Sequence, residues 1–124
     1  MAPISYSLHG VQVLECAPDG EKLKSERDAI DLIGEAGRHG AILVVIPVER
    51  LDDDFFRLRT GIAGAIVQKF VTYRLRLAIV GDISWHVSES AALRDFVRET
   101  NRGAQVWFVA SREELGQRLL RDAG

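Results

Sequence analysis

A run of six apolar residues, AILVVI at positions 41–46, constrains the fold more than any other feature of the sequence. A strand that faces water on one side alternates apolar and polar residues, and this run does not alternate. It is therefore typical of a strand with both faces covered, as in a parallel sheet flanked by helices. Amphipathic helical patterns stand before and after the run, so helices and strands alternate along the chain.

Apolar periodicity and turn residues predict the other elements. The dipeptide His9-Gly10 separates two short strand-like stretches and is typical of a hairpin turn, because glycine supplies the positive φ that such turns need. We predict strands at 4–8, 11–16, 41–46, 75–80 and 105–109, and helices whose apolar stripes lie within 29–36, 62–70, 92–97 and 115–120. The segments 47–59 and 83–90 are expected to be irregular.

These elements predict a single α/β domain over residues 1–124. Parallel strands joined by right-handed crossovers account for the alternation, and the opening hairpin adds an antiparallel edge. The expected fold is a mostly parallel sheet of four to five strands with an N-terminal hairpin and about four helices.

Composition limits the function classes. The net charge is −2, which argues against nucleic acid or an anionic membrane surface as a partner. Cys16 is the only cysteine, so an internal disulfide is excluded and a cytoplasmic location is expected. The N-terminal residues lack the pattern of a secretory signal. No apolar run is long enough to span a bilayer.

The first candidate site is the start of the second long helix, where Arg57, Arg59 and Thr60 precede Gly61. The first N–H groups of a helix have no internal partner and attract anions, and two arginines add positive charge. Two interpretations are open. The residues form an anion or phosphate site, or Thr60 is an N-cap and the arginines are solvated or paired with the aspartates at 52–54. The pattern of a nucleotide-triphosphate loop is absent.

The second candidate site is the segment GDISWHVSES, which carries Asp82, Ser84, Trp85 and His86. Serine, histidine and a carboxylate are the residue types of a hydrolase, but one short segment seldom brings them together, and no nucleophile elbow is present. Ser88 or Ser90 is interpreted as a helix cap. His86 is either a packing histidine or a base, and no catalytic residue is assigned.

No metal site or cofactor is expected. The three histidines lie on separate elements, and no HxxxH or CxxC spacing exists. The aspartates at 52–54 lack the alternating ligands and the glycine of a calcium loop, and they are interpreted as a solvated turn. The segment Asn101-Arg102-Gly103 is interpreted as the end of a helix, with Gly103 after its last turn and a cation near its free carbonyls.

Three segments, DFFRLRTGIAGAIVQKF, LAIVGDIS and LRDFVRETNRG, resemble the bacterial family called domain of unknown function 4180. The resemblance covers nearly the whole chain, and its strings recur in the same order as in the family. It implies a shared fold and no particular activity.

The layout is also similar to the STAS (sulfate transporter and anti-sigma-factor antagonist) domain, whose small members act in bacterial regulation. In those antagonists a core strand and a loop lead to a helix start of the form D-S-[ST]-G-L-G. Here Thr60 falls on the phosphorylatable hydroxyl and Gly61 on the next glycine, while Leu58 and Arg59 replace the acidic residue and the first serine. The resemblance implies a regulatory module that phosphorylation of Thr60 controls.

Two functions are carried forward. One is a small regulatory or protein-interaction module that binds a protein partner or a second copy of itself through the two candidate segments. The other is a small-molecule enzyme or binding protein in which Arg57 and Arg59 hold an anionic ligand and Asp82 or His86 acts as acid or base. A closed apolar pocket between the two segments, with Asp82 or His86 facing inward, favours the second function, whereas a flat sheet edge with both side chains in solvent argues against it.

Overall fold

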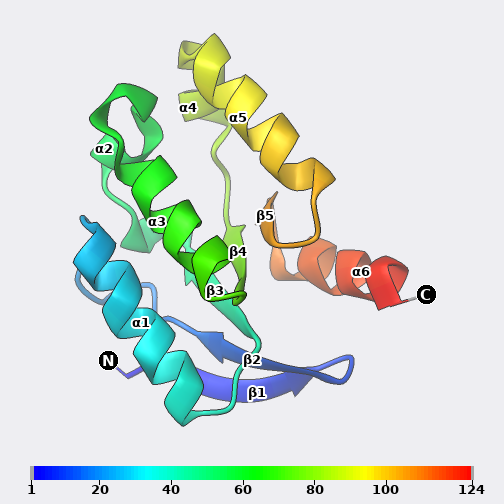
Figure 1. Ribbon diagram of the computed structural model, residues 1–124. Helices are drawn as coiled ribbons and strands as arrows, with labels where there is room; N and C mark the ends of the chain where they lie inside the picture. The colour runs from blue at the N-terminus through cyan, green and yellow to red at the C-terminus, as the bar shows by residue number, and fades with distance from the viewer. Residues whose placement is uncertain (1, 124) are drawn as a thin grey trace.

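A computed structural model of the chain describes residues 2–123 as a five-stranded sheet with helices on both faces (Figure 1). The strands lie in sequence order, the first pair is antiparallel and every later pair is parallel. The predicted α/β class, the mostly parallel sheet and the N-terminal hairpin are confirmed. The strands are β1 (Ile4–Leu8), β2 (Val11–Glu15), β3 (Leu43–Pro47), β4 (Arg76–Val80) and β5 (Val106–Val109).

The strand order determines where the helices lie. Each right-handed crossover between neighbouring parallel strands leaves its helix on the same face. Helices α1, α3 and α5 therefore share one face of the sheet, and α6 covers the other (Figure 1). The long helices are α1 (Glu26–Arg38), α3 (Ile62–Thr72), α5 (Ala91–Arg102) and α6 (Arg112–Ala123); the short ones are η1 (Val48–Arg50), α2 (Asp53–Phe56), η2 (Leu58–Thr60) and α4 (Ser84–Glu89).

Two cores, one on each face of β3, explain the last four residues of the apolar run; Ala41 and Ile42 precede the strand, and Ile42 is 53% exposed. Val44 and Ile46 face the three-helix side, whereas Leu43 and Val45 face α6. Each of these four side chains is at most 1% exposed, as expected for a strand covered on both faces. Leu119 of α6 is buried in the second core. The next residue, Leu120, which we predicted in the same stripe, is 53% exposed, because it lies on the outer side of the helix.

The two segments predicted to be irregular contain short helices instead. Pro47–Arg59 includes η1, α2 and part of η2, and α4 occupies most of 83–90. A helix of one or two turns is too short to show an apolar repeat, so the pattern could not reveal it. A local side-chain bond lies at the start of α2 and of α4: Asp52 accepts a hydrogen bond from the N–H of Asp54 at 3.3 Å, and Asp82 accepts one from the N–H of Ser84 at 2.9 Å.

The outer edge of β5 is closed by a side chain. The Asn101 amide nitrogen donates to the Phe108 carbonyl at 3.1 Å, and its oxygen accepts from the Phe108 N–H at 2.7 Å. The amide thus takes the place of a neighbouring strand. Gly103 follows the helix, as predicted, but with an extended backbone, φ −83° and ψ −178°, in place of the left-handed conformation that glycine commonly has at a helix end.

A buried carboxylate joins the hairpin to α6. Glu15 is 3% exposed and accepts a hydrogen bond from the Tyr6 hydroxyl at 2.6 Å, and it forms an ion pair with Arg112. Burial raises the pKa of the Tyr6 hydroxyl, and the positive charge of Arg112 opposes the rise. The three side chains fasten β1, β2 and the first turn of α6 to one another.

Candidate functional site

A cleft of about 550 Å³ lies beyond the carboxyl ends of β3 and β4 and brings the two candidate segments together. The carboxyl ends of neighbouring parallel strands meet at the same sheet edge, so the segments that follow them face each other. One wall comes from the α2–η2 segment and the other from α4 and the start of α5. The lining residues are Asp53, Phe56, Arg57, Leu58, Arg59, Trp85, His86, Glu89, Ser90 and Ala92.

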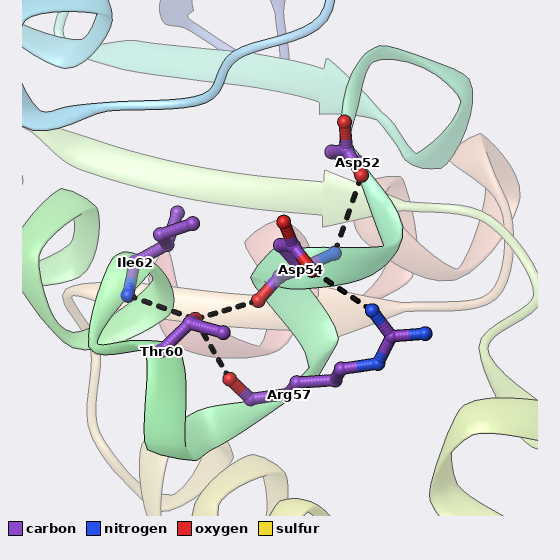
Figure 2. A network of polar contacts seen from close by, with 5 residues as sticks. All are labelled: Asp52, Asp54, Arg57, Thr60 and Ile62. Atoms are coloured by element: carbon purple, nitrogen blue, oxygen red, sulfur yellow. Dashed lines mark hydrogen bonds and ion pairs between the residues drawn. The ribbon is translucent and has the colours of Figure 1, made fainter.

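The two arginines of the first wall differ in their ion pairing. The guanidinium of Arg57 forms an ion pair with Asp54 at 2.8 Å, and both side chains are exposed (Figure 2). Such an exposed pair contributes little to stability, about 0–1 kcal/mol, and a stronger anion can replace Asp54. Within residues 2–123, no ion pair or side-chain hydrogen bond involves Arg59. Of the two cleft arginines, Arg59 is therefore the one without a carboxylate partner in the described part of the chain.

Thr60 holds the first wall in place. Its hydroxyl lies 2.7 Å from the carbonyl oxygen of Asp54 and 2.8 Å from that of Arg57, and it accepts from the N–H of Ile62 at 3.3 Å (Figure 2). A hydroxyl has one proton, so the two carbonyls share it. These contacts tie α2 to the start of α3.

The N-cap position of α3 is taken by Gly61. Its backbone is left-handed, with φ 78° and ψ −3°, a conformation that glycine adopts without strain. Thr60, which we predicted as one interpretation of the cap, lies in η2. Its oxygen nevertheless accepts a hydrogen bond from the N–H of Ile62, so one donor that we expected to be free for an anion already has a partner.

The second wall presents aromatic surface. The His86 ring stacks on Phe56 with centroids 4.1 Å apart and an angle of 14° between the planes, which joins the two walls. Trp85 packs edge-on against His86 and is 67% exposed. A large exposed indole beside arginines is characteristic of binding surfaces, since it offers apolar area at a small entropic cost.

Asp82 and Ser84 lie outside this cleft. They line a neighbouring hollow of about 310 Å³ with residues of β5 and α5. Hydrogen bonds from the Ser84 hydroxyl and N–H stabilise the ionised carboxylate and lower the pKa of Asp82. The second candidate segment therefore divides: Trp85 and His86 face the arginines, whereas the two polar residues before them do not.

The serines near His86 are used by helices. Ser88 donates to the carbonyl of Trp85 at 2.7 Å, and Ser90 caps α5 by accepting from the N–H of Leu93 at 3.1 Å, as we predicted for one of the two. In the described part of the chain, no group of three or more His, Cys, Asp or Glu side chains is placed to hold a metal ion. The cleft therefore combines two arginines and two carboxylates, those of Asp53 and Glu89, with an aromatic surface.

Phe56 is the cleft residue that sequence reasoning missed. It belongs to the pair Phe55-Phe56, which stands in a polar segment without any helical stripe. Phe55 enters the main core, and Phe56 packs edge-on against it at 5.1 Å while forming the support for His86. Two adjacent aromatic residues within a charged segment were the available signal, because such a pair must find an apolar partner.

Fold and site together define a small α/β domain with an accessible cleft at the carboxyl edge of its sheet, lined by two arginines, two carboxylates and aromatic side chains. The chain belongs to the family described as Domain of unknown function (DUF4180), whose model matches residues 8–119. Searches of curated proteins and of solved structures gave no match. The resemblance to STAS domains stays a prediction. No helix within residues 2–123 is both long and apolar enough to cross a membrane.

Proposed function

We propose that this protein is a small cytoplasmic regulatory module whose cleft binds an acidic group of a partner protein. The observation that carries the proposal is the meeting of Arg57 and Arg59 with Trp85 and His86 across one cleft. An acidic side chain on the partner bonds the arginines, and an adjacent apolar side chain covers Trp85. Arginine suits this role because its planar donors match a carboxylate.

Thr60 is the control point in this proposal. It is exposed, and its hydroxyl holds the carbonyls of Asp54 and Arg57. A phosphate on that oxygen removes the donated proton and adds negative charge beside two carbonyl oxygens. The phosphate also competes with Asp54 for the Arg57 guanidinium. Both effects reshape the first wall, so modification of Thr60 switches partner affinity.

Charge reversal at Arg59 tests the cleft. Arg59→Glu places a carboxylate in the path of the partner's acidic group, and we expect affinity to fall by about tenfold or more, or about 1.4 kcal/mol. The matched control is Arg98→Glu, which makes the same change on an exposed α5 arginine outside the cleft. The measurement is the amount of each protein captured from host extract by the three forms. Equal capture by all three contradicts the proposal.

Three substitutions at Thr60 test the switch. Thr60→Ser keeps the hydroxyl and should bind like the wild type. Thr60→Ala removes the contacts that tie α2 to α3, and Thr60→Glu also adds charge. We expect the Thr60→Glu and Thr60→Ala proteins to bind the partner with different affinities. Equal affinity of the Ala and Glu forms excludes control by charge at this position.

A second function, the binding of a small anionic molecule, is supported by the cleft volume. About 550 Å³ lies within the range of roughly 300–1,000 Å³ that small-molecule sites occupy. Arg57 and Arg59 fit its anionic group and Trp85 a planar apolar part. Native and denaturing mass spectra of protein purified from its host separate the functions. Mass present only in the native spectrum favours a ligand, whereas about 80 Da retained after denaturation and mapped to Thr60 favours the switch.

The buried thiol supports the proposed cytoplasmic location. Cys16 is 3% exposed and free, and burial raises the pKa of its thiol while the nearby Arg50 opposes the rise. A buried protonated thiol reacts slowly and needs no disulfide partner. This is the state expected of a protein kept in a reducing compartment.

A further inference from the structure

The two edges of the sheet differ in how they are protected. On β5 the Asn101 amide bonds both backbone groups of Phe108. On β1, by contrast, residues 4–8 make no backbone hydrogen bond except with β2, as far as residues 2–123 are concerned. β1 forms the free margin of the sheet (Figure 1). It has the sequence ISYSL, with no charge, proline or bulge to prevent pairing with another strand.

The hydrogen bonds of β2 show which groups of β1 point outward. The Gln12 carbonyl and the Cys16 N–H bond to the β3 side, so the backbone groups of 11, 13 and 15 face β1. Their partners in the antiparallel register are Leu8, Tyr6 and Ile4. The intervening residues Ser5 and Ser7 therefore direct their N–H and C=O groups away from the sheet.

The side chains of β1 are arranged so that one antiparallel register of self-pairing places apolar residues opposite apolar ones and serines opposite serines. Successive side chains of a strand point to opposite faces. Tyr6 and Leu8 pack with the second core, and Ile4 shares their face but is 59% exposed. Ser5 and Ser7 lie on the opposite face, and Ser5 accepts a hydrogen bond from the Gln12 amide at 2.9 Å.

We propose that two copies of this chain form a symmetric dimer by antiparallel pairing of their β1 strands, with Tyr6 opposite Tyr6 at the two-fold axis. Ser5 of each chain then faces Ser7 of the other, and these two residues exchange N–H···O bonds in both directions. Ile4 of each chain packs against Leu8 of the other, which covers its exposed side chain. The two sheets join into one continuous sheet of ten strands, because each contributes five.

Other self-pairings make poorer use of the edge. A two-fold axis at Ser5 places Pro3, which has no N–H, opposite Ser7. An axis at Ser7 places Ser5 opposite the hairpin turn at His9. Only the axis at Tyr6 pairs all of residues 4–8 and uses both outward serines of each chain. A parallel arrangement lacks this self-matching exchange. The inference does not depend on the cleft, which lies beyond β3 and β4.

The first test is the solution mass of the wild type and of Ser7→Pro, measured by light scattering after gel filtration. Proline removes an N–H that points away from β2, so the intramolecular ladder stays intact and only the pairing between chains is blocked. We expect the mass of two chains for the wild type and for Ser7→Ala, and the mass of one chain for Ser7→Pro. A monomeric wild type at about millimolar concentration, or a Ser7→Pro dimer, overturns the proposal.

A cross-linking test fixes the register and remains decisive if Ser7→Pro does not fold. Ile4→Cys and Leu8→Cys are made as two separate proteins, mixed, and oxidised with oxidised glutathione. The proposed register brings these positions within about 4.5 Å between Cα atoms, close enough for a disulfide. We expect covalent dimers in the mixture and none in either protein alone, with the buried Cys16 unreacted. Dimers of equal amount in the separate proteins, or none in the mixture, contradict the register.

Discussion

Replacing Asn101 with alanine tests how the sheet ends at β5. The substitution removes both hydrogen bonds to Phe108, at 3.1 and 2.7 Å, and leaves one N–H and one C=O of a residue that is 5% exposed without their partner. Each lost bond with its unpaired group costs about 1–2 kcal/mol. Alanine is the better helix former by roughly 0.5 kcal/mol, which offsets part of the loss. The expected net fall in the free energy of unfolding is about 1.5–3.5 kcal/mol.

Urea unfolding followed by far-UV circular dichroism measures this effect. With a typical slope of about 1–3 kcal/mol per molar urea, the midpoint should fall by roughly 0.5 M or more. The matched control is Glu99→Ala on the exposed side of the same helix, which should change stability by about 0.5 kcal/mol or less. If Asn101→Ala shifts the midpoint no more than the control, the amide does not act as a substitute strand. Light scattering of the variant should also reveal association through the opened edge.

Three further predictions concern stability. Gly81→Ala should destabilise the fold by about 2 kcal/mol or more in urea unfolding, because φ is 145° and a Cβ would lie 2.6 Å from a methyl carbon of Val48; wild-type stability would refute this. Glu15→Ala should cost about 1–3 kcal/mol, and Glu15→Gln less, since the amide oxygen still accepts from Tyr6; equal losses would show that this bond contributes nothing. Because burial raises the pKa of Cys16, its thiol ionises more readily in the unfolded chain than in the folded one. The contribution of this thiol to the free energy of unfolding is therefore fully present below pH 9.0, the ordinary pKa, and decreases above it. Cys16→Ala should make the free energy of unfolding decrease less steeply above that pH, and an unchanged pH profile would exclude this cause.

The architecture was predictable because it rests on patterns that repeat over several residues. The unbroken apolar run at 41–46 indicated a strand covered on both faces, and His9-Gly10 indicated the hairpin. Both residues of that turn have positive φ, 50° and 81°, as a two-residue hairpin requires. Gly40 has φ 64° just beyond α1, at a place where a glycine is typical of a helix end.

The details that escaped prediction depend on contacts between distant residues. No local pattern shows that Asn101 reaches the backbone of Phe108, or that the buried Glu15 meets Arg112 at a separation of 97 positions. Cleft residues were predictable in part, since topology places Arg57 and Trp85 at the same sheet edge. Their mutual arrangement was not, because it depends on the short helices α2 and α4 and on the stacking of Phe56 with His86.

The most direct test of the cleft as a binding surface is site-specific photo-cross-linking in the native host. A photoreactive phenylalanine derivative replaces Trp85 in one protein and Arg98 in a control protein, both exposed positions, of which only the first lines the cleft. Our account predicts a discrete cross-linked protein partner from position 85 that is lost when Arg59→Glu is added, and no such product from position 98. Products of equal amount from both positions, or a product at 85 that Arg59→Glu leaves unchanged, would contradict it.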